Sequence, residues 1–205
     1  NGNGGARLRK EVLLDGVKTP VTQVVGHFNA VIFLPQMTRI LEGGPEERRR
    51  YLNLASAQAD PFFTQALSEY NQALTQRNAL LKLLAERGGD TSQLDYWDDI
   101  LTSRGTKIIH SRILAIKEIE KLAIRIHEKL SGGKEVLRLD YQPSYDPLPK
   151  PEGQFSLPLQ TSVQRDSFSI KEIQLGFTEK LKQARTEEIA RGITTIGPHR
   201  DEMRI

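Results

Sequence analysis

The sequence predicts an α+β protein in which short strands near both ends of the chain flank a long helical segment. The first 35 residues alternate turns with short apolar runs, which is typical of strands. Residues 45–130 change to an apolar spacing of three and four, which is typical of helices. Strand-like residues return in ITTIGPHRDEMRI, at positions 193–205. We therefore expect the strands from both ends to share one sheet, with the helices inserted between them.

The composition is that of a soluble, helix-rich protein. The chain has 205 residues, enough for one sizeable core or two small ones, with 38% hydrophobic and 27% charged residues. It has no cysteine, which excludes disulfides and thiolate zinc sites. No run reaches ~18 apolar residues and no charged-then-apolar leader opens the chain, so we expect a cytoplasmic protein without membrane contact. The net charge of +3 is compatible with a polyanionic partner but does not require one.

Turn and strand signals fill the first 35 residues. Asp15 and Gly16 form a hairpin-type turn between the runs EVLL and VKTPV. The run AVIFL at positions 30–34 is apolar throughout, which predicts a strand buried on both faces. The opening NGNGGARLRK lacks a Gly-Lys-Ser/Thr triplet, so we interpret it as a turn and not as a phosphate-binding loop.

Three helices are predicted in the middle of the chain. The first begins at Pro45, because proline suits the first helical position and the following acids suit the positive helix end. Two longer helices run from about residue 62 to 87 and from about 94 to 130, joined by the turn GGDTSQ. Their stripes, which Arg77 and Arg112 interrupt, are Phe63, Leu67, Tyr70, Leu74, Leu81 and Leu84, and Ile109, Ile116, Ile119, Ala123, Ile126 and Leu130. These matched stripes predict an antiparallel coiled-coil hairpin, an arm of about 40 Å.

The last third of the chain mixes strand, loop and helix signals. SGGKEVLRLDY ends the long helix and starts a strand, and a proline-rich, irregular stretch follows. A final helix is predicted from about residue 169 to 191, and it stops at Gly192. The β-branched run ITTI then leads into the charged segment that begins at Gly197.

The ionisable residues form no recognisable catalytic group. The histidines are not spaced as metal ligands, so we predict no metal site within this chain: His27, His110, His127 and His199. His199, Arg200 and Asp201 spell the His-Arg-Asp of a protein-kinase loop, but the Asn that should follow is missing. A charged turn after a strand is the alternative. A phosphotransfer enzyme that uses His199 and Asp201 would have to show metal-dependent turnover by this chain alone.

Two groups of cations are candidates for contact with phosphates. Arg48, Arg49 and Arg50 follow one another at a helix start, so at most two of them can face one ligand. A second group recurs every four residues along the long helix: Lys117, Lys121, Arg125 and Lys129. Such a basic stripe could follow a DNA backbone. For both groups, a solvated helix face remains the alternative.

Two segments together resemble the RecF family of bacterial DNA replication and repair proteins, of the SMC-like ABC ATPase class. They are FLPQMTRILEGGPEERRRYLN at positions 33–53 and GITTIGPHRDEM at positions 192–203, and YNQALTQRNALLK resembles a further block. The positions that carry the match are Pro35, Gly43, Pro45, Arg48, Arg49, Gly197, Pro198, His199, Arg200 and Asp201. The sequence departs from the family pattern at Gln36 and Glu202, where the family usually has an acidic residue and an Asp.

The resemblance implies a partial ABC-ATPase-like head with an inserted antiparallel helical coiled-coil arm. Residues 1–44 would supply head strands and residues 45–135 the arm. Residues 136–205 would supply a return strand, a proline-rich loop, and a helix and strand back to the head. Gln36 would lie on the nucleotide side, where related heads have a Q-loop glutamine. The phosphate loop, signature motif and Walker B acids are missing from the sequence. We therefore expect an internal segment that binds no cofactor and hydrolyses no ATP by itself.

For the complete protein, the resemblance implies an ATP- and Mg-dependent homodimer that binds DNA at gaps and at double-strand/single-strand junctions. It also implies cooperation with RecR and RecO in loading RecA, and roles in recombination and the SOS response. The alternative is the coiled-coil interaction arm of another SMC-like ATPase. Longer heptad repeats on either side of this segment would favour that alternative.

Overall fold

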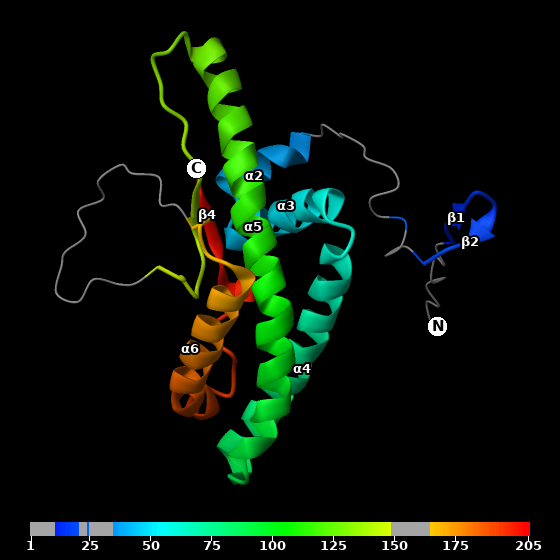
Figure 1. Cartoon of the computed structure of the whole chain (residues 1–205), viewed down its shortest axis with the longest axis vertical. Coiled ribbons are helices and arrows are strands. Elements are labelled where there is room, and N and C mark those ends of the chain that lie inside the picture. The colour runs from blue at the N-terminus through cyan, green and yellow to red at the C-terminus, as the bar shows by residue number, and fades with distance from the viewer. Residues whose placement is uncertain (1–10, 21–23, 25–34, 149–164) are drawn as a thin grey trace, which may run out of the picture.

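In a computed structural model of the protein, four long helices make up most of the described part of the chain (Figure 1). The structure describes residues 11–20, 24, 35–148 and 165–205. The long helices are α3 (Pro45–Ala59), α4 (Phe63–Arg87), α5 (Leu94–Ser131) and α6 (Ile170–Arg191). The shorter elements are β1 (Leu13–Leu14), β2 (Val17–Lys18), η1 (Pro35–Thr38), α2 (Arg39–Glu42), η2 (Thr91–Gln93), β3 (Asp140–Gln142), η3 (Pro198–Arg200) and β4 (Glu202–Arg204). The predicted opening turn at 1–10 and buried strand at 30–34 lie outside the described residues.

Helices α4 and α5 form an antiparallel hairpin, as the sequence predicts. Gly88, with a φ of 67°, ends α4, and the Asp90 carboxylate accepts a hydrogen bond from the Ser92 amide at the start of the next turn. The two helices run antiparallel, since the short connection between them reverses the chain and Arg77 of α4 contacts Asp98 near the start of α5. Both helices begin and end within one or two residues of the predicted positions.

The seam between these helices differs from the predicted two-helix coiled coil. On α4 the buried residues are Phe63, Ala66, Tyr70, Ala73, Arg77, Leu81 and Leu84. Leu67 and Leu74 lie at the edge of that core and are only partly buried. Helix α6 packs against both α4 and α5, and its Leu181 belongs to the same cluster as Tyr70. The described residues therefore form a three-helix arrangement here, and a two-helix coiled coil is not confirmed.

The C-terminal part of α5 extends beyond its neighbours (Figure 1). Ile116 is the last buried residue of this helix. The predicted seam residues Ile126 and Leu130 are 59% and 83% exposed. Helix α4 begins at Phe63, which is too late in an antiparallel pair to cover this end of α5. The periodicity correctly predicted a helix here but not its burial.

Two separate two-stranded sheets are present among the described residues. β1 and β2 form the predicted hairpin, and both turn residues have positive φ, 49° at Asp15 and 81° at Gly16. β3 and β4 pair antiparallel with Tyr141 opposite Met203, and both of these side chains are buried. The expectation of one sheet shared by the two ends is therefore wrong for the strands described. β4 pairs instead with β3, whose buried face joins the core of α3, α5 and α6.

Candidate functional site

The two segments that carry the family pattern meet in the structure, because the start of α3 packs against β4. Arg48 donates from Nε at 2.7 Å and from Nη2 at 3.1 Å to the two carboxylate oxygens of Glu202. Its Nη1 donates at 2.6 Å to the Gly43 carbonyl oxygen. The hydrogen bond with Glu202 raises the pKa of Arg48, and it is also the largest cause of the lowered pKa of Glu202. A bidentate ion pair thus ties α3 to β4 across the length of the chain.

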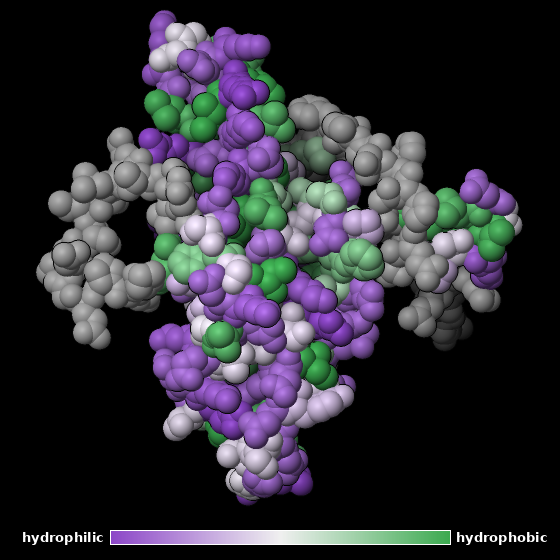
Figure 2. All heavy atoms as spheres, viewed as in Figure 1, coloured by the Kyte–Doolittle hydropathy of each residue, from purple (hydrophilic) through white to green (hydrophobic). Residues whose placement is uncertain are grey.

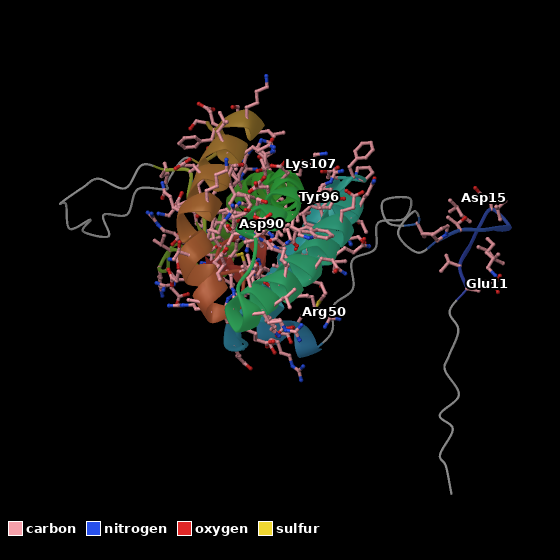
Figure 3. All side chains as sticks on the ribbon, turned by 90° about the horizontal axis from the view of Figure 1, so that it is seen from below. Glu11, Asp15, Arg50, Asp90, Tyr96 and Lys107 are labelled. Atoms are coloured by element: carbon pink, nitrogen blue, oxygen red, sulfur yellow. The ribbon has the colours of Figure 1, made fainter. Side chains whose placement is uncertain are left out.

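The neighbouring arginines have fewer partners. Arg49 is partly buried and donates from Nη1 at 2.8 Å to the main-chain oxygen of Asp201. Arg50 is exposed and lies at the outer surface of the helices (Figure 3). Within the described part of the chain, Arg50 makes no hydrogen bond or ion pair. Of the three consecutive arginines, Arg50 therefore has the most freedom to bind another molecule.

Asp201 is a fully buried carboxylate at the centre of this site. Its Oδ2 accepts hydrogen bonds from Arg112 Nη1 at 2.8 Å and from the Tyr141 hydroxyl, and its Oδ1 accepts one from the Ser144 amide at 2.9 Å. Burial raises the pKa of Asp201, and Arg112 is the largest opposing influence. Because its oxygens are occupied by donors from α5 and from the β3 segment, Asp201 has a structural role and is not placed to act as a general base.

Arg112 joins three segments at the same place. Besides Asp201, its Nη1 donates at 2.6 Å to the Pro198 carbonyl oxygen, and its Nη2 donates at 2.8 Å to Asn53 Oδ1. The side chain is 2% exposed. In the sequence, Arg112 stands out only as an interruption of an apolar stripe. An arginine at a position of the stripe where an apolar, buried residue is expected is the signal that could have indicated an ion pair.

His199 is held as a neutral imidazole. Its Nδ1 lies 2.6 Å from the Tyr70 hydroxyl and its Nε2 lies 3.2 Å from the Thr194 carbonyl oxygen. The pKa of His199 is lowered to about 4, mainly by burial and in addition by the positive charges of Arg200, Arg49 and Arg77. The neutral ring therefore donates from Nε2 to Thr194 and accepts at Nδ1 from Tyr70.

Gly197 must be a glycine for this turn to form. Its φ is 132°, and a Cβ there would overlap the Tyr70 hydroxyl. Its amide donates at 2.7 Å to Ser144 Oγ, and its carbonyl accepts from that hydroxyl at 2.8 Å. The predicted motif at 197–201 is therefore a packed turn between the helices and β4.

A cavity of about 390 Å³ opens between the start of α3, the first half of α4 and η3. It brings together residues from several predicted groups. Those of polar character are Glu46, Arg49, Arg50, Asn53, Tyr70, Asn71, Arg112 and His199. It is therefore a mainly cationic cavity at the point where the family segments meet.

The basic stripe lines a second, larger cavity of about 550 Å³ between α5 and the β3 segment. Lys117, Lys121 and Arg125 contribute to its wall, and Lys129 does not. Lys117 pairs with Asp166, which raises the pKa of that lysine. Lys121 lies 4.0 Å from Glu118, and the side chains of both lysines remain more than half exposed. Three of the four predicted cations are thus brought to one groove.

The residues available do not make up a complete ATP–magnesium site. The sequence has no Gly-Lys-Ser/Thr loop, and the described residues contain no group of three His, Cys, Asp or Glu side chains that could hold a metal ion. The side chains of Pro35 and Gln36 lie outside the described part of the structure, so the nucleotide-side role of Gln36 stays a prediction. Among the described helices, none combines the length and apolar character that crossing a membrane requires.

No protein-family model matches the chain. The curated proteins that it resembles share one name. A protein of Herpetosiphon aurantiacus named DNA replication and repair protein RecF is 35% identical over 198 residues, which are 96% of this chain and 45% of that protein. The protein of the same name from Halothermothrix orenii is 32% identical over 200 residues, 97% of this chain and 49% of that protein. The chain thus spans about half the length of the curated relatives it matches.

Solved structures agree with the curated relatives. The recombination mediator protein RecF with ATP, described as part of the RecFOR pathway, matches with a TM-score of 0.79 and 26% identity. That match covers 96% of this chain and 48% of the solved chain. The corresponding structure with ATPrS matches with a TM-score of 0.78 over 93% of this chain. From its sequence, its fold and the meeting of its two motif segments, the chain belongs to the RecF family of DNA replication and repair proteins.

Proposed function

We propose that the chain acts, as part of a RecF-type protein, in the ATP-dependent binding of DNA at gaps and double-strand/single-strand junctions. It would promote RecA loading together with RecR and RecO, in an ATP- and Mg-dependent homodimer. The observation that carries the proposal is the match to RecF proteins over 96% of the chain. Relatives solved with ATP and described in the RecFOR pathway support the nucleotide and the partners.

Within such a protein, these residues would supply helices and the contacts that attach them, and not the hydrolysis of ATP. The sequence contains no phosphate loop, signature motif or Walker B acids. The Arg48–Glu202 and Arg112–Asp201 ion pairs hold α3, α5 and β4 together. We therefore expect no ATPase activity from the 205 residues alone.

The DNA contacts are proposed at two places. The first is the stripe Lys117, Lys121, Arg125 and Lys129, which is exposed along α5. The second is the arginine group at the start of α3, where Arg50 is the best placed and Arg49 keeps part of its guanidinium unpaired. Arg48 is the weakest of these candidates, because Glu202 and Gly43 already accept from three of its nitrogens.

The projecting end of α5 supports the alternative function, that of a coiled-coil interaction arm. It exposes apolar side chains in a region where Figure 2 shows hydrophobic residues among hydrophilic ones; they are Leu122, Ile126 and Leu130. Such a helix end resembles part of a coiled-coil arm that pairs with a further helix. We propose that this end belongs to the arm and that it contacts a protein partner.

The salt dependence of duplex binding tests the DNA contacts. Fluorescence anisotropy of a labelled duplex would be measured with a complete protein that contains this chain, in the presence of ATP and Mg, between about 50 and 200 mM salt. Changing Lys117, Lys121, Arg125 and Lys129 to Gln should weaken binding and reduce the slope of log K against log salt by about 0.9 for each phosphate that the variant no longer neutralises. The matched control changes four exposed cations elsewhere to Gln: Arg87, Lys107, Lys171 and Lys180.

Equal slopes for the two quadruple variants would reject the stripe as a DNA-binding surface, because both variants have the same net charge. A slope reduced in the stripe variant alone would support it.

A further inference from the structure

The cavity between α3, α4 and η3 has the size of a small-ligand site. Its volume of about 390 Å³ lies within the range of roughly 300–1,000 Å³ that is usual for such pockets. Its wall combines an apolar side, which includes Leu67 and Pro198, with polar side chains from α3, α4, α5 and η3. A few polar groups that converge on a partly apolar cavity are what orients a bound ligand.

The charges around this cavity do not cancel. Its wall contains three guanidinium groups, those of Arg49, Arg50 and Arg112, and one carboxylate, that of Glu46. Asp201 compensates Arg112 from behind the wall, so two arginines face a single Glu. Arg49 donates a hydrogen bond only to a carbonyl oxygen, and its nearest carboxylate influence is that of Glu202, which already forms an ion pair with Arg48. In the described residues, Glu46 forms no ion pair with either neighbour.

Several donors at the cavity have no acceptor within the described structure. Arg112 Nε is buried without a hydrogen-bond partner. Asn53 accepts from Arg112 at its Oδ1, so its Nδ2 donor points elsewhere, and no described group accepts from it. The side chain of Asn71 is exposed and likewise has no described partner. A buried donor without an acceptor is costly, so an anion that supplied acceptor oxygens here would be stabilised.

His199 lines the same cavity and lies close to several of these positive charges. Its pKa is lowered first by burial and then by the charges of Arg200, Arg49 and Arg77. The ring lines the cavity but keeps both nitrogens bonded to Tyr70 and Thr194. It therefore adds no negative charge and no competing acceptor to the cavity.

We propose that this cavity binds a phosphate group, held by Arg50 and Arg49 with Asn53, Asn71 and Arg112 as further donors. Guanidinium groups suit phosphate because they offer paired donors in one plane. The phosphate could be inorganic or part of a mononucleotide, or it could end a nucleic-acid strand. This proposal rests on the proposed function in one respect: Arg49 and Arg50 are proposed there as contacts to DNA, whose phosphates are the same kind of group. It does not involve the basic stripe on α5.

Nuclear magnetic resonance of the isotope-labelled 205-residue chain tests the site directly. Inorganic phosphate is titrated at constant ionic strength with chloride, and the arginine Nε–Hε signals and the His199 ring signals are followed. Saturable shifts are expected at Arg50, Arg112 and His199. The Arg50→Gln variant keeps the fold because Arg50 is exposed, and it should weaken phosphate binding by about tenfold. Arg87→Gln, which removes an exposed cation from the end of α4, should leave binding unchanged.

The source of the phosphate follows from parallel titrations with adenosine monophosphate and with a short oligonucleotide, with and without a 5′ phosphate. Tighter binding of either phosphorylated probe than of inorganic phosphate supports the site and identifies its source. Shifts that do not saturate, or that are equal in Arg50→Gln and Arg87→Gln, overturn the proposal. Saturable binding of an acidic peptide without binding of phosphate also overturns it. The α5 stripe variant distinguishes this site from the proposed DNA-binding residues of α5. If the variant loses duplex binding but still binds phosphate, the two sites are separate.

Discussion

Asp201 and His199 belong to the same five-residue motif, but their environments give them different roles. Asp201 is buried and accepts hydrogen bonds from Arg112, Tyr141 and Ser144. His199, two residues earlier, lies among positive charges and is kept neutral. The kinase-like sequence His-Arg-Asp is therefore a structural turn in which neither ionisable side chain is free for proton transfer.

The low pKa of His199 predicts a loss of stability in acid. The folded protein holds the pKa near 4, below the ordinary 6.5, so the unfolded chain binds more protons between these values. This contribution is fully present above pH 6.5 and is lost as the pH falls towards 4, to a total of about 3 kcal/mol. His199→Gln should flatten the pH dependence of the unfolding free energy over this interval, measured by urea denaturation. A variant with the same pH dependence as the original protein would contradict this role of His199.

At the scale of elements, the close approach of three helices depends on Gly105. This glycine lies in α5, and a Cβ there would be 2.8 Å from Phe177 of α6 and 3.0 Å from Tyr70 of α4. Both aromatic side chains are buried, so neither can move without disturbing the core. The close approach of α6 to the α4–α5 hairpin at this point therefore requires a glycine in α5.

Gly105→Ala should therefore destabilise the protein, although alanine is the better helix former by about 1 kcal/mol. Overpacking costs about 1–3 kcal/mol, so the expected net loss is up to about 2 kcal/mol in the unfolding free energy. In Gly44→Ala, by contrast, a Cβ would contact nothing within 4 Å, so no overpacking cost is expected there. A stabilised Gly105→Ala protein in urea denaturation would show that the helices can separate at little cost.

The predicted helices agree with the structure, whereas the predicted seam does not. Helix boundaries depend on local features such as Pro45, the turn at Gly88 and the capping of α6 by Ser169. Which face of a helix is buried depends on its neighbours. The stripe through Ile126 and Leu130 stays exposed because α4 does not reach it, and α6 buries a different face near Gly105.

At the scale of the whole molecule, a buried ionic network joins segments far apart in the sequence. Arg77 of α4 donates from Nε at 2.6 Å to Asp98 of α5 and pairs through Nη1 at 2.7 Å with Glu188 of α6. The same Nη1 donates at 2.8 Å to the Thr194 hydroxyl, in the segment that leads to the motif turn. Arg185 pairs with Asp98 from the other side at 2.7 Å. This network connects α4, α5 and α6 with the candidate site.

Removal of the central cation should be strongly destabilising. Arg77→Ala leaves the buried Glu188 without its ion-pair partner and Asp98 with Arg185 alone, so the expected loss in unfolding free energy is about 3–5 kcal/mol. Arg87→Ala removes an exposed arginine from the same helix and should change stability by less than about 0.5 kcal/mol. Urea denaturation measures both. Similar stabilities for the two variants would mean that solvent reaches the network.

The long helices, the β1–β2 hairpin and the family could be predicted from the sequence alone, the family through two short segments. These features depend on residues that are close in the sequence, such as the turn at Asp15 and Gly16 or the motif at 197–201. The folded structure was needed to show that Arg48 pairs with Glu202, that Arg77 and Arg112 are buried, and that three arginines line one cavity. The partners of these arginines lie many residues away, and periodicity cannot tell a solvated cation from a buried one because both interrupt an apolar stripe in the same way.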